Sequence, residues 1–266
     1  MMSGEEPPII QRQPEREMKQ PRVGVLLVHG LNGSHQDMEE LAIFLTQHGM
    51  VTENMLLPGH GTHVRDLLSL GWTDWSTAVQ VETKRLKQRC DLVFLIGHSL
   101  GGALCLHTAA HEQVHGIVSM CAPLHMFFWT RPAVQLAMRF TPVLPTVRED
   151  VRDGKARKRY TRNVYRWTPM RPVNSMLDFL PTLRREIPRI SAPVLVMNAI
   201  RDHVVPASDG FEIYRIIGSH DKELLTLHRS YHVIMLDHDR DEVFARTLSF
   251  LKRQIAQYHD ITEQTA

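Results

Sequence analysis

Ser99 stands between two glycines in the stretch VFLIGHSLGGALCLH, residues 93–107, which gives the pattern G-x-S-x-G with Gly97 and Gly101. This pattern is typical of a nucleophile elbow, a sharp strand-to-helix turn that presents a serine hydroxyl at the N-terminus of a helix. A glycine-rich turn without any chemistry would carry the same letters. The residues that a serine nucleophile needs around it therefore decide between the two interpretations.

A serine hydroxyl is a weak nucleophile until a base removes its proton, and His232 is the best placed of the 16 histidines for that role. It follows the last apolar run after a short polar turn, in ELLTLHRSYHVIMLDHD. Asp202, in APVLVMNAIRDHVVP, follows the preceding apolar run and would fix the tautomer of the imidazole. The order Ser99, Asp202, His232 is the chain order of α/β-hydrolases, so the sequence predicts a catalytic triad.

Four other residues compete for these roles. His228 is expected to pack in or at the end of the last strand, and His238 lies near the start of the following helix. His98 is the neighbour of the serine, so its side chain should point away from the serine hydroxyl. Asp209 is the alternative acid, but it falls where the next helix should already run.

A serine nucleophile also needs an oxyanion hole, formed by two N–H donors aimed at the developing negative charge. The backbone N–H of Leu100, directly after the nucleophile, is the first expected donor. The second is assigned to the backbone N–H of Leu31, in the loop VHGLNG that follows the first apolar run. His29 and Gly30 of this loop are expected to form a tight turn, which is compatible with that role.

The elements that must position these residues are read from hydrophobic periodicity. Uninterrupted apolar runs predict six strands, over residues 23–28, 51–57, 92–96, 116–120, 194–197 and 224–227. Between most of them lie helical patterns, over residues 38–48, 75–90, 103–109 and 244–255. Strands that alternate with helices predict an α/β fold with a mostly parallel central sheet covered by helices.

The alternation stops between residues 123 and 188, where prolines, arginines and aromatic residues are mixed. We predict a small helical cap over residues 123–188, inserted into a core of residues 22–122 and 189–266, after a loose tail at residues 1–21. Aromatic residues and methionines of the cap should mostly pack on the core, and some should line a pocket beneath it. Its basic residues are expected to form a solvated face, with an anionic substrate or a membrane surface as the alternative; they are Arg148, Arg152, Lys155, Arg157, Lys158, Arg159, Arg162 and Arg166, against Glu149, Asp150 and Asp153.

The composition indicates an ordinary globular chain of 266 residues, with 43% hydrophobic residues and a formal net charge of +2. This length supports one α/β domain with a substantial core, and the charge implies no nucleic-acid partner. The first residues hold no apolar stretch long enough for a signal peptide or a membrane span. A cytoplasmic protein without an integral membrane segment is therefore expected.

Cysteine and histidine spacing gives no sign of a metal centre. Cys90, Cys105 and Cys121 are an odd number at wide spacing in apolar stretches, which favours buried free thiols over disulfides or metal ligands. His60 and His63 lie close together in GHGTH, but no carboxylate or cysteine cluster accompanies them at ligand spacing. We expect structural roles for both histidines, and neither a metal nor a cofactor in the reaction.

Taken as a set, the motifs VHGLNGSHQDM, LLPGHGTH, GHSLGG, RDHVVP and SYHVI resemble the carboxylesterase and monoacylglycerol lipase group of the α/β-hydrolase superfamily. The resemblance covers nearly the whole chain after about residue 21. It implies an α/β-hydrolase fold with a small helical cap over an acyl pocket, and ester hydrolysis through an acyl-enzyme. It also implies the same roles for Ser99, Asp202, His232 and the N–H groups of Leu31 and Leu100.

One departure from related enzymes concerns the oxyanion loop, where a bulky leucine follows the HG pair in place of the HGGG type. This departure counts against esters of crowded tertiary alcohols. The leading prediction is a serine carboxylesterase that acts on short to medium acyl esters or monoacylglycerols. A carbon–carbon bond hydrolase with the same triad and a non-hydrolytic receptor on the same fold are the alternatives, and the fold alone does not separate them.

Overall fold

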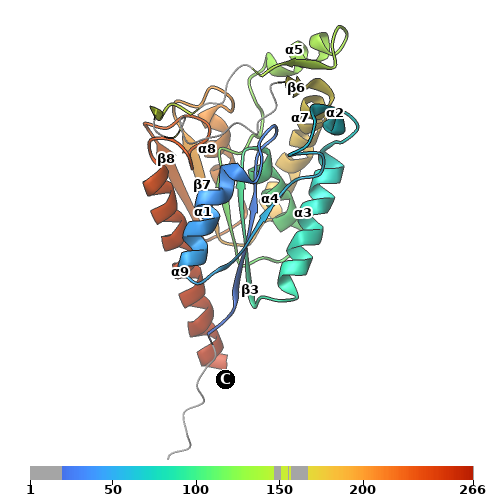
Figure 1. The fold of residues 1–266 in the computed structure, drawn as a ribbon. Helices are drawn as coiled ribbons and strands as arrows, with labels where there is room; N and C mark the ends of the chain where they lie inside the picture. The colour runs from blue at the N-terminus through green and yellow to red at the C-terminus, as the bar shows by residue number, and fades with distance from the viewer. Residues whose placement is uncertain (1–19, 147–150, 155, 157–166, 266) are drawn as a thin grey trace, which may run out of the picture.

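The computed structural model describes residues 20–146, 151–154, 156 and 167–265 (Figure 1). Nearly all of the expected tail at residues 1–21 lies outside these ranges. So do most of the charged residues of the expected basic face; Arg152 and Asp153 are described.

The core is a six-stranded sheet in the order β2-β1-β3-β4-β7-β8, and every neighbouring pair is parallel. Its strands are β1 (Val23–Val28), β2 (Val51–Met55), β3 (Leu92–His98), β4 (Gly116–Met120), β7 (Val194–Ala199) and β8 (Lys222–Leu227). The four inner strands are buried along their whole length, as expected for strands covered on both faces. All six predicted strands and the α/β fold class are confirmed.

Helices cover both faces of this sheet (Figure 1). One buried apolar cluster joins the sheet to α3 (Trp72–Lys87), α4 (Leu100–His111) and α8 (Ala207–Ile216). The other cluster joins the opposite face to α1 (Gln36–Gln47) and α9 (Arg240–Thr265). A short helix, α2 (Val64–Leu67), precedes α3. The two clusters hold the strands in a rigid layer, and the turns after the strands are built on that layer.

In the segment between β4 and β7, the described residues include helix α5 (Thr130–Ala137), helix α7 (Met170–Glu186) and the 3-10 helix η1 (Ile187–Arg189). It also contains a short antiparallel pair, β5 (Val143–Pro145) with β6 (Trp167–Pro169), which the expectation of a purely helical cap misses. Strands of three residues are too short to show a period-two pattern. Figure 1 shows α5 and β6 above the carboxyl ends of the central strands.

The three cysteines are free and buried, as predicted. In the described part of the chain, no helix is both long enough and apolar enough to cross a lipid bilayer.

Candidate active site

Ser99 occupies the turn between β3 and α4, where its backbone has φ 53° and ψ −122°. A positive φ is unfavourable for any residue with a Cβ, so the surrounding packing must hold this turn in place. The turn can pack this closely because Gly97 and Gly101 have no side chains. A Cβ on Gly97 would clash with the carbonyl of Gly101, and a Cβ on Gly101 would clash with the carbonyl of Val28. Only 9% of the Ser99 surface is accessible, so the hydroxyl lies in a covered site.

Asp202 and His232 form the central contact of the site, with 2.7 Å between Asp202 Oδ2 and His232 Nδ1. Both residues are buried. The backbone N–H groups of Val204 and Val205 each donate to Asp202 Oδ1 over 2.8 Å. Burial alone would raise the pKa of Asp202, but the His232 ring and the two N–H donors outweigh it and lower that pKa. The carboxylate is therefore ionised and directed at the imidazole.

The loop that carries His232 lies against the end of β3, beside the turn that carries Ser99. His98 Nε2 is 3.0 Å from the carbonyl oxygen of His232, and the two rings are 4.7 Å apart. Burial, followed by the proximity of His232, lowers the pKa of His98 to about 3, so His98 is neutral at pH 7 and donates to that carbonyl. His98 thus acts as a support for the His232 loop.

The loop after β1 also runs close to Ser99. A Cβ on Gly30 would lie 3.1 Å from the Cβ of Ser99, and the N–H of Gly33 closes the predicted tight turn on the carbonyl of Gly30 over 3.1 Å. Among the described residues, neither the N–H of Leu31 nor that of Leu100 donates a hydrogen bond.

His29 fixes this loop from within the core. Its Nε2 accepts the N–H of Leu57 over 3.1 Å, and its Nδ1 therefore carries the proton and donates to the carbonyl of Gly30 over 2.8 Å. Burial, with a smaller effect of His60, lowers the pKa of His29 to about 3, so the ring is neutral. The loop next to Ser99 is held by a completely buried side chain.

Cys121 lies next to Asp202 and His232, a placement that the sequence did not reveal. Its sulfur lies within 4.8 Å of ligand atoms of Asp202 and His232, and its backbone has a positive φ of 48°. Burial and the Asp202 carboxylate raise the pKa of the Cys121 thiol well above its usual value. The group remains a thiol and donates to Asp202, and the raised pKa disfavours the thiolate that a metal would require.

The competing residues have other roles. Asp209 Oδ2 accepts the N–H groups of Leu124, His125 and Met126 over 2.7, 2.9 and 3.1 Å, and so holds the chain where it leaves the core after β4. His228 is exposed directly after β8, so the expectation that it packs is wrong.

His238, His60 and His63 lie where the sequence predicted them. His238 pairs with Asp153 Oδ2 at 3.8 Å and lies just before α9. His60 is buried against His29 and Trp75, and His63 caps α2 through the N–H of Arg65. His60 and His63 therefore have the structural roles predicted for them.

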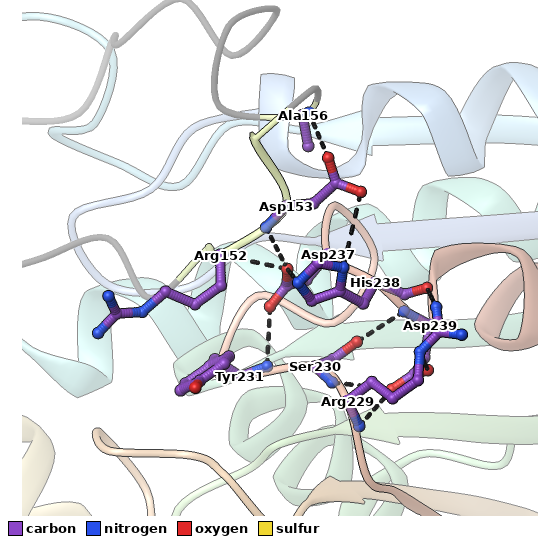
Figure 2. Close-up of polar contacts among 9 residues, drawn as sticks. All are labelled: Arg152, Asp153, Ala156, Arg229, Ser230, Tyr231, Asp237, His238 and Asp239. Carbon is purple, nitrogen blue, oxygen red and sulfur yellow. Dashed lines mark hydrogen bonds and ion pairs between the residues drawn. The ribbon is translucent and has the colours of Figure 1, made fainter.

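Asp237 ties the loop of the candidate base to the segment between β5 and β6 (Figure 2). Its Oδ2 accepts the N–H of Tyr231 over 2.8 Å, one residue before His232. Its Oδ1 accepts the N–H groups of Arg152 and Asp153 over 3.0 and 2.8 Å. The side chain is completely buried, so three backbone donors depend on this one carboxylate.

A second carboxylate closes the same loop. Asp239 Oδ2 accepts the N–H groups of Arg229 and Ser230 over 3.0 and 2.8 Å, and the N–H of Asp239 donates to Ser230 Oγ over 2.7 Å (Figure 2). The two aspartates of the stretch LDHD are visible in the sequence. Their partners are backbone N–H groups on the other side of a turn, and no side-chain pattern marks these groups. The supporting roles of Asp237 and Asp239 were therefore not predicted.

A cavity of about 340 Å³ lies between α7 and the chain around residues 124–131. Its apolar lining includes Leu124, Phe127, Leu177 and Leu180, and Arg131 and Arg184 lie at its edge. Leu124 follows β4, the strand next to β3, and its N–H donates to Asp209 at the point where the chain leaves the core. The expectation that apolar residues of the insertion line a pocket fits this arrangement.

Comparisons with known proteins place this geometry in context. The family described as serine aminopeptidase, S33, matches residues 19–239. The chain is 32% identical over 232 residues to a thermostable monoacylglycerol lipase of Bacillus sp. (strain H-257), covering 87% of this chain and 91% of that protein. It is 28% identical over 233 residues to a carboxylesterase of Bacillus subtilis (strain 168), covering 86% and 92%.

A solved structure reported for the metagenome-derived lipolytic enzymes LipS and LipT is similar as well. It shares 32% sequence identity and a TM-score of 0.81 with this chain, covering 87% of this chain and 94% of that one. A monoglyceride lipase structure from Saccharomyces cerevisiae, at 18% identity and a TM-score of 0.76, shares the fold.

Proposed function

The chain belongs to the serine aminopeptidase S33 family, and we propose that it is a serine carboxylesterase that hydrolyses short to medium acyl esters or monoacylglycerols. The relatives confirm the predicted membership of the carboxylesterase and monoacylglycerol lipase group. They also support esters as the substrate class. The acyl length, the roles of individual residues and the cytoplasmic location expected from the sequence remain parts of the proposal.

In the proposed reaction, Ser99 Oγ attacks the ester carbonyl carbon while His232 Nε2 takes its proton. Asp202 accepts the hydrogen bond from His232 Nδ1 and stabilises the imidazolium that forms. The carbonyl oxygen, now negative, accepts hydrogen bonds from the N–H groups of Leu31 and Leu100. The alcohol leaves with the proton of His232, and water then attacks the acyl-enzyme by the same route and releases the acid.

The observation that carries this proposal is the 2.7 Å contact between Asp202 and His232, in a loop bonded to the residue that precedes Ser99. Because Asp202 accepts the proton-bearing Nδ1 of His232, the Nε2 of His232 is unprotonated. A serine hydroxyl requires such a nitrogen to take its proton. The ionised and hydrogen-bonded carboxylate behind this histidine argues against a receptor that has lost the chemistry of the fold. The comparisons favour ester hydrolysis over carbon–carbon bond cleavage.

We further propose that residues 123–188 form a cap and that the cavity against α7 accepts the acyl chain. The cavity is lined mainly by apolar side chains, so each methylene buried there should contribute about 0.8 kcal/mol to binding. Its volume of about 340 Å³ limits the chain that fits. Specificity should therefore rise with acyl length and then fall once the chain outgrows the cavity.

The test is kcat/KM for nitrophenyl esters from acetyl to palmitoyl, with an olive-oil emulsion measured alongside. We expect a maximum below about ten carbons and poor hydrolysis of the emulsion. A steady rise through palmitoyl with strong emulsion hydrolysis would identify a true lipase. Absence of turnover on every ester would favour a receptor.

Ser99→Ala should remove nearly all ester turnover and leave the protein folded, because the hydroxyl supports no core contact. Ser119→Ala is the matched control, since Ser119 is a buried serine on the neighbouring strand β4. It should retain turnover. Equal activity of Ser99→Ala and wild type would overturn the assignment of the nucleophile.

A further inference from the structure

His107 and His111 lie one turn apart on α4, and Glu186 faces them from the last residue of α7. His107 Nδ1 is 2.7 Å from Glu186 Oε2, and His111 Nε2 is 3.1 Å from Glu186 Oε1. Residues four apart on a helix share one face, so both rings reach the same carboxylate. This cluster plays no part in the proposed ester hydrolysis.

We propose that His107, His111 and Glu186 form a binding site for a divalent transition metal ion, with Zn²⁺ as the best-fitting ion. Two imidazole nitrogens and a carboxylate oxygen are a donor set that zinc prefers. The three ligand atoms lie within 4.8 Å of one another. Ligand atoms around a tetrahedral zinc are separated by about 3.3 Å, so side-chain movements of up to about 1.5 Å would complete the site.

The fourth coordination position is open to water. The side chain of His111 is 43% exposed, whereas those of His107 and Glu186 are 9% and 11% exposed. The site is thus closed on the core side and reachable from solvent. Each ring can carry its proton on the nitrogen that faces away from Glu186, which leaves the facing nitrogen free to bind the metal.

The surroundings fix the buried ligand. The rings of Trp72 and Phe179 stack on each other at 4.9 Å, and each meets the ring of His107 almost at a right angle. Support of this kind reduces the entropy lost when a metal binds.

The acidic neighbour of His111 does not compete for the ion. The carboxylate of Glu112 is paired with Lys84 at 3.1 Å and with Lys87 at 3.2 Å, so it is already neutralised. Glu186 is therefore the carboxylate that serves both histidines.

A bound ion would join two elements that belong to different parts of the fold. The nucleophile turn begins α4, and His107 follows Ser99 by about 12 Å along that helix. Helix α7 carries Leu177 and Leu180, which line the cavity proposed for the acyl chain. The metal would hold α7 on α4 and so stabilise the cavity wall, without entering the chemistry at Ser99.

The test uses the full-length protein, treated with EDTA and dialysed, and ZnCl₂ as the probe. Isothermal titration calorimetry should show one saturable zinc site per chain in wild type. At free zinc about 100 times the dissociation constant, the melting temperature should rise by roughly 5–10 °C. His111→Ala and the isosteric Glu186→Gln should both lose this site and this rise. His220→Ala is the matched control, an exposed histidine far along the chain, and it should retain them.

Equal zinc binding and equal zinc-dependent melting shifts in wild type and His111→Ala would overturn the proposal, as would the absence of saturable binding in wild type. The readout is the rise in melting temperature when zinc is added to each protein. A small change in the metal-free melting temperature of a variant therefore does not affect the conclusion. Zinc bound near His232 would inhibit ester turnover equally in wild type and His111→Ala. Comparing zinc inhibition of ester turnover in wild type and His111→Ala therefore separates zinc at the cluster of His107, His111 and Glu186 from zinc near His232.

Discussion

Replacing Asp202 by asparagine separates the orientation of His232 from the stability of its loop. Asp202 Oδ1 accepts the N–H groups of Val204 and Val205, and Oδ2 contacts His232 Nδ1. In Asp202→Asn, the amide oxygen can still accept both backbone donors. The amide NH₂ now faces His232 Nδ1 and donates to it, which moves the imidazole proton to Nε2, where the proton of Ser99 should go.

This wrong tautomer should lower kcat by about 10⁴-fold, the loss known for the same exchange in a Ser-His-Asp triad, equivalent to about 5.5 kcal/mol. The effect should be somewhat milder than that of Ser99→Ala. The folded state should lose little stability, because both backbone donors keep a partner. Asp202→Ala should lose activity and also about 1–3 kcal/mol of unfolding free energy, since the buried N–H of Val205 is then unpaired, whereas the N–H of Val204 lies at the surface and can bond to water.

The assay pairs single-turnover and steady-state hydrolysis of a nitrophenyl ester with urea denaturation of each variant. Asp209→Asn is the matched control, because Asp209 is also a buried carboxylate that accepts several backbone N–H groups but does not contact His232. It should lose less than about tenfold in kcat. A kcat of Asp202→Asn within tenfold of wild type would refute the role given to this carboxylate.

Three further predictions follow from the same contacts. Asp237→Asn should lower kcat more than it raises KM, because the N–H of Tyr231 and the segment 152–153 compete for one remaining oxygen; equal kcat values in steady-state assays would contradict this. The free energy of unfolding should fall as the pH drops below about 6.5, because His29 and His98 have pKa values lowered to about 3 by burial and take up protons only on unfolding; equal urea midpoints at pH 7 and pH 5 would contradict this. EDTA should leave kcat/KM unchanged, since the proposed nucleophile is a serine activated by a histidine; a loss that zinc restores equally in wild type and in His111→Ala would point to a metal in the reaction.

The sequence predicted the elements whose local pattern is strong. Six buried strands appear as uninterrupted apolar runs, and the glycines around Ser99 mark a turn that no other residue type would fit. Because parallel strands place their following turns at one edge of the sheet, Asp202 and His232 could be assigned from their position after two of these strands. That topology brings the two residues together, and the bonds from Val204, Val205 and His98 hold their 2.7 Å contact.

The parts that the sequence did not predict depend on contacts between distant segments. Asp237 binds backbone donors 84 and 85 residues away, and backbone donors carry no side-chain signal. Cys121 meets Asp202 only because β4 and β7 are neighbours in the sheet. His228 was expected to pack, but no apolar pattern extends past the end of β8 to bury it.

The central claim is that Ser99 is the nucleophile, and covalent labelling tests it most directly. The purified protein is incubated with an alkyl fluorophosphonate, which phosphonylates activated serines, and is then analysed by intact mass and by peptide mapping. We expect one adduct per chain, located on Ser99, with parallel loss of ester turnover, and no adduct in Ser99→Ala. An adduct that persists in Ser99→Ala, or full turnover in a protein labelled at Ser99, would contradict the account.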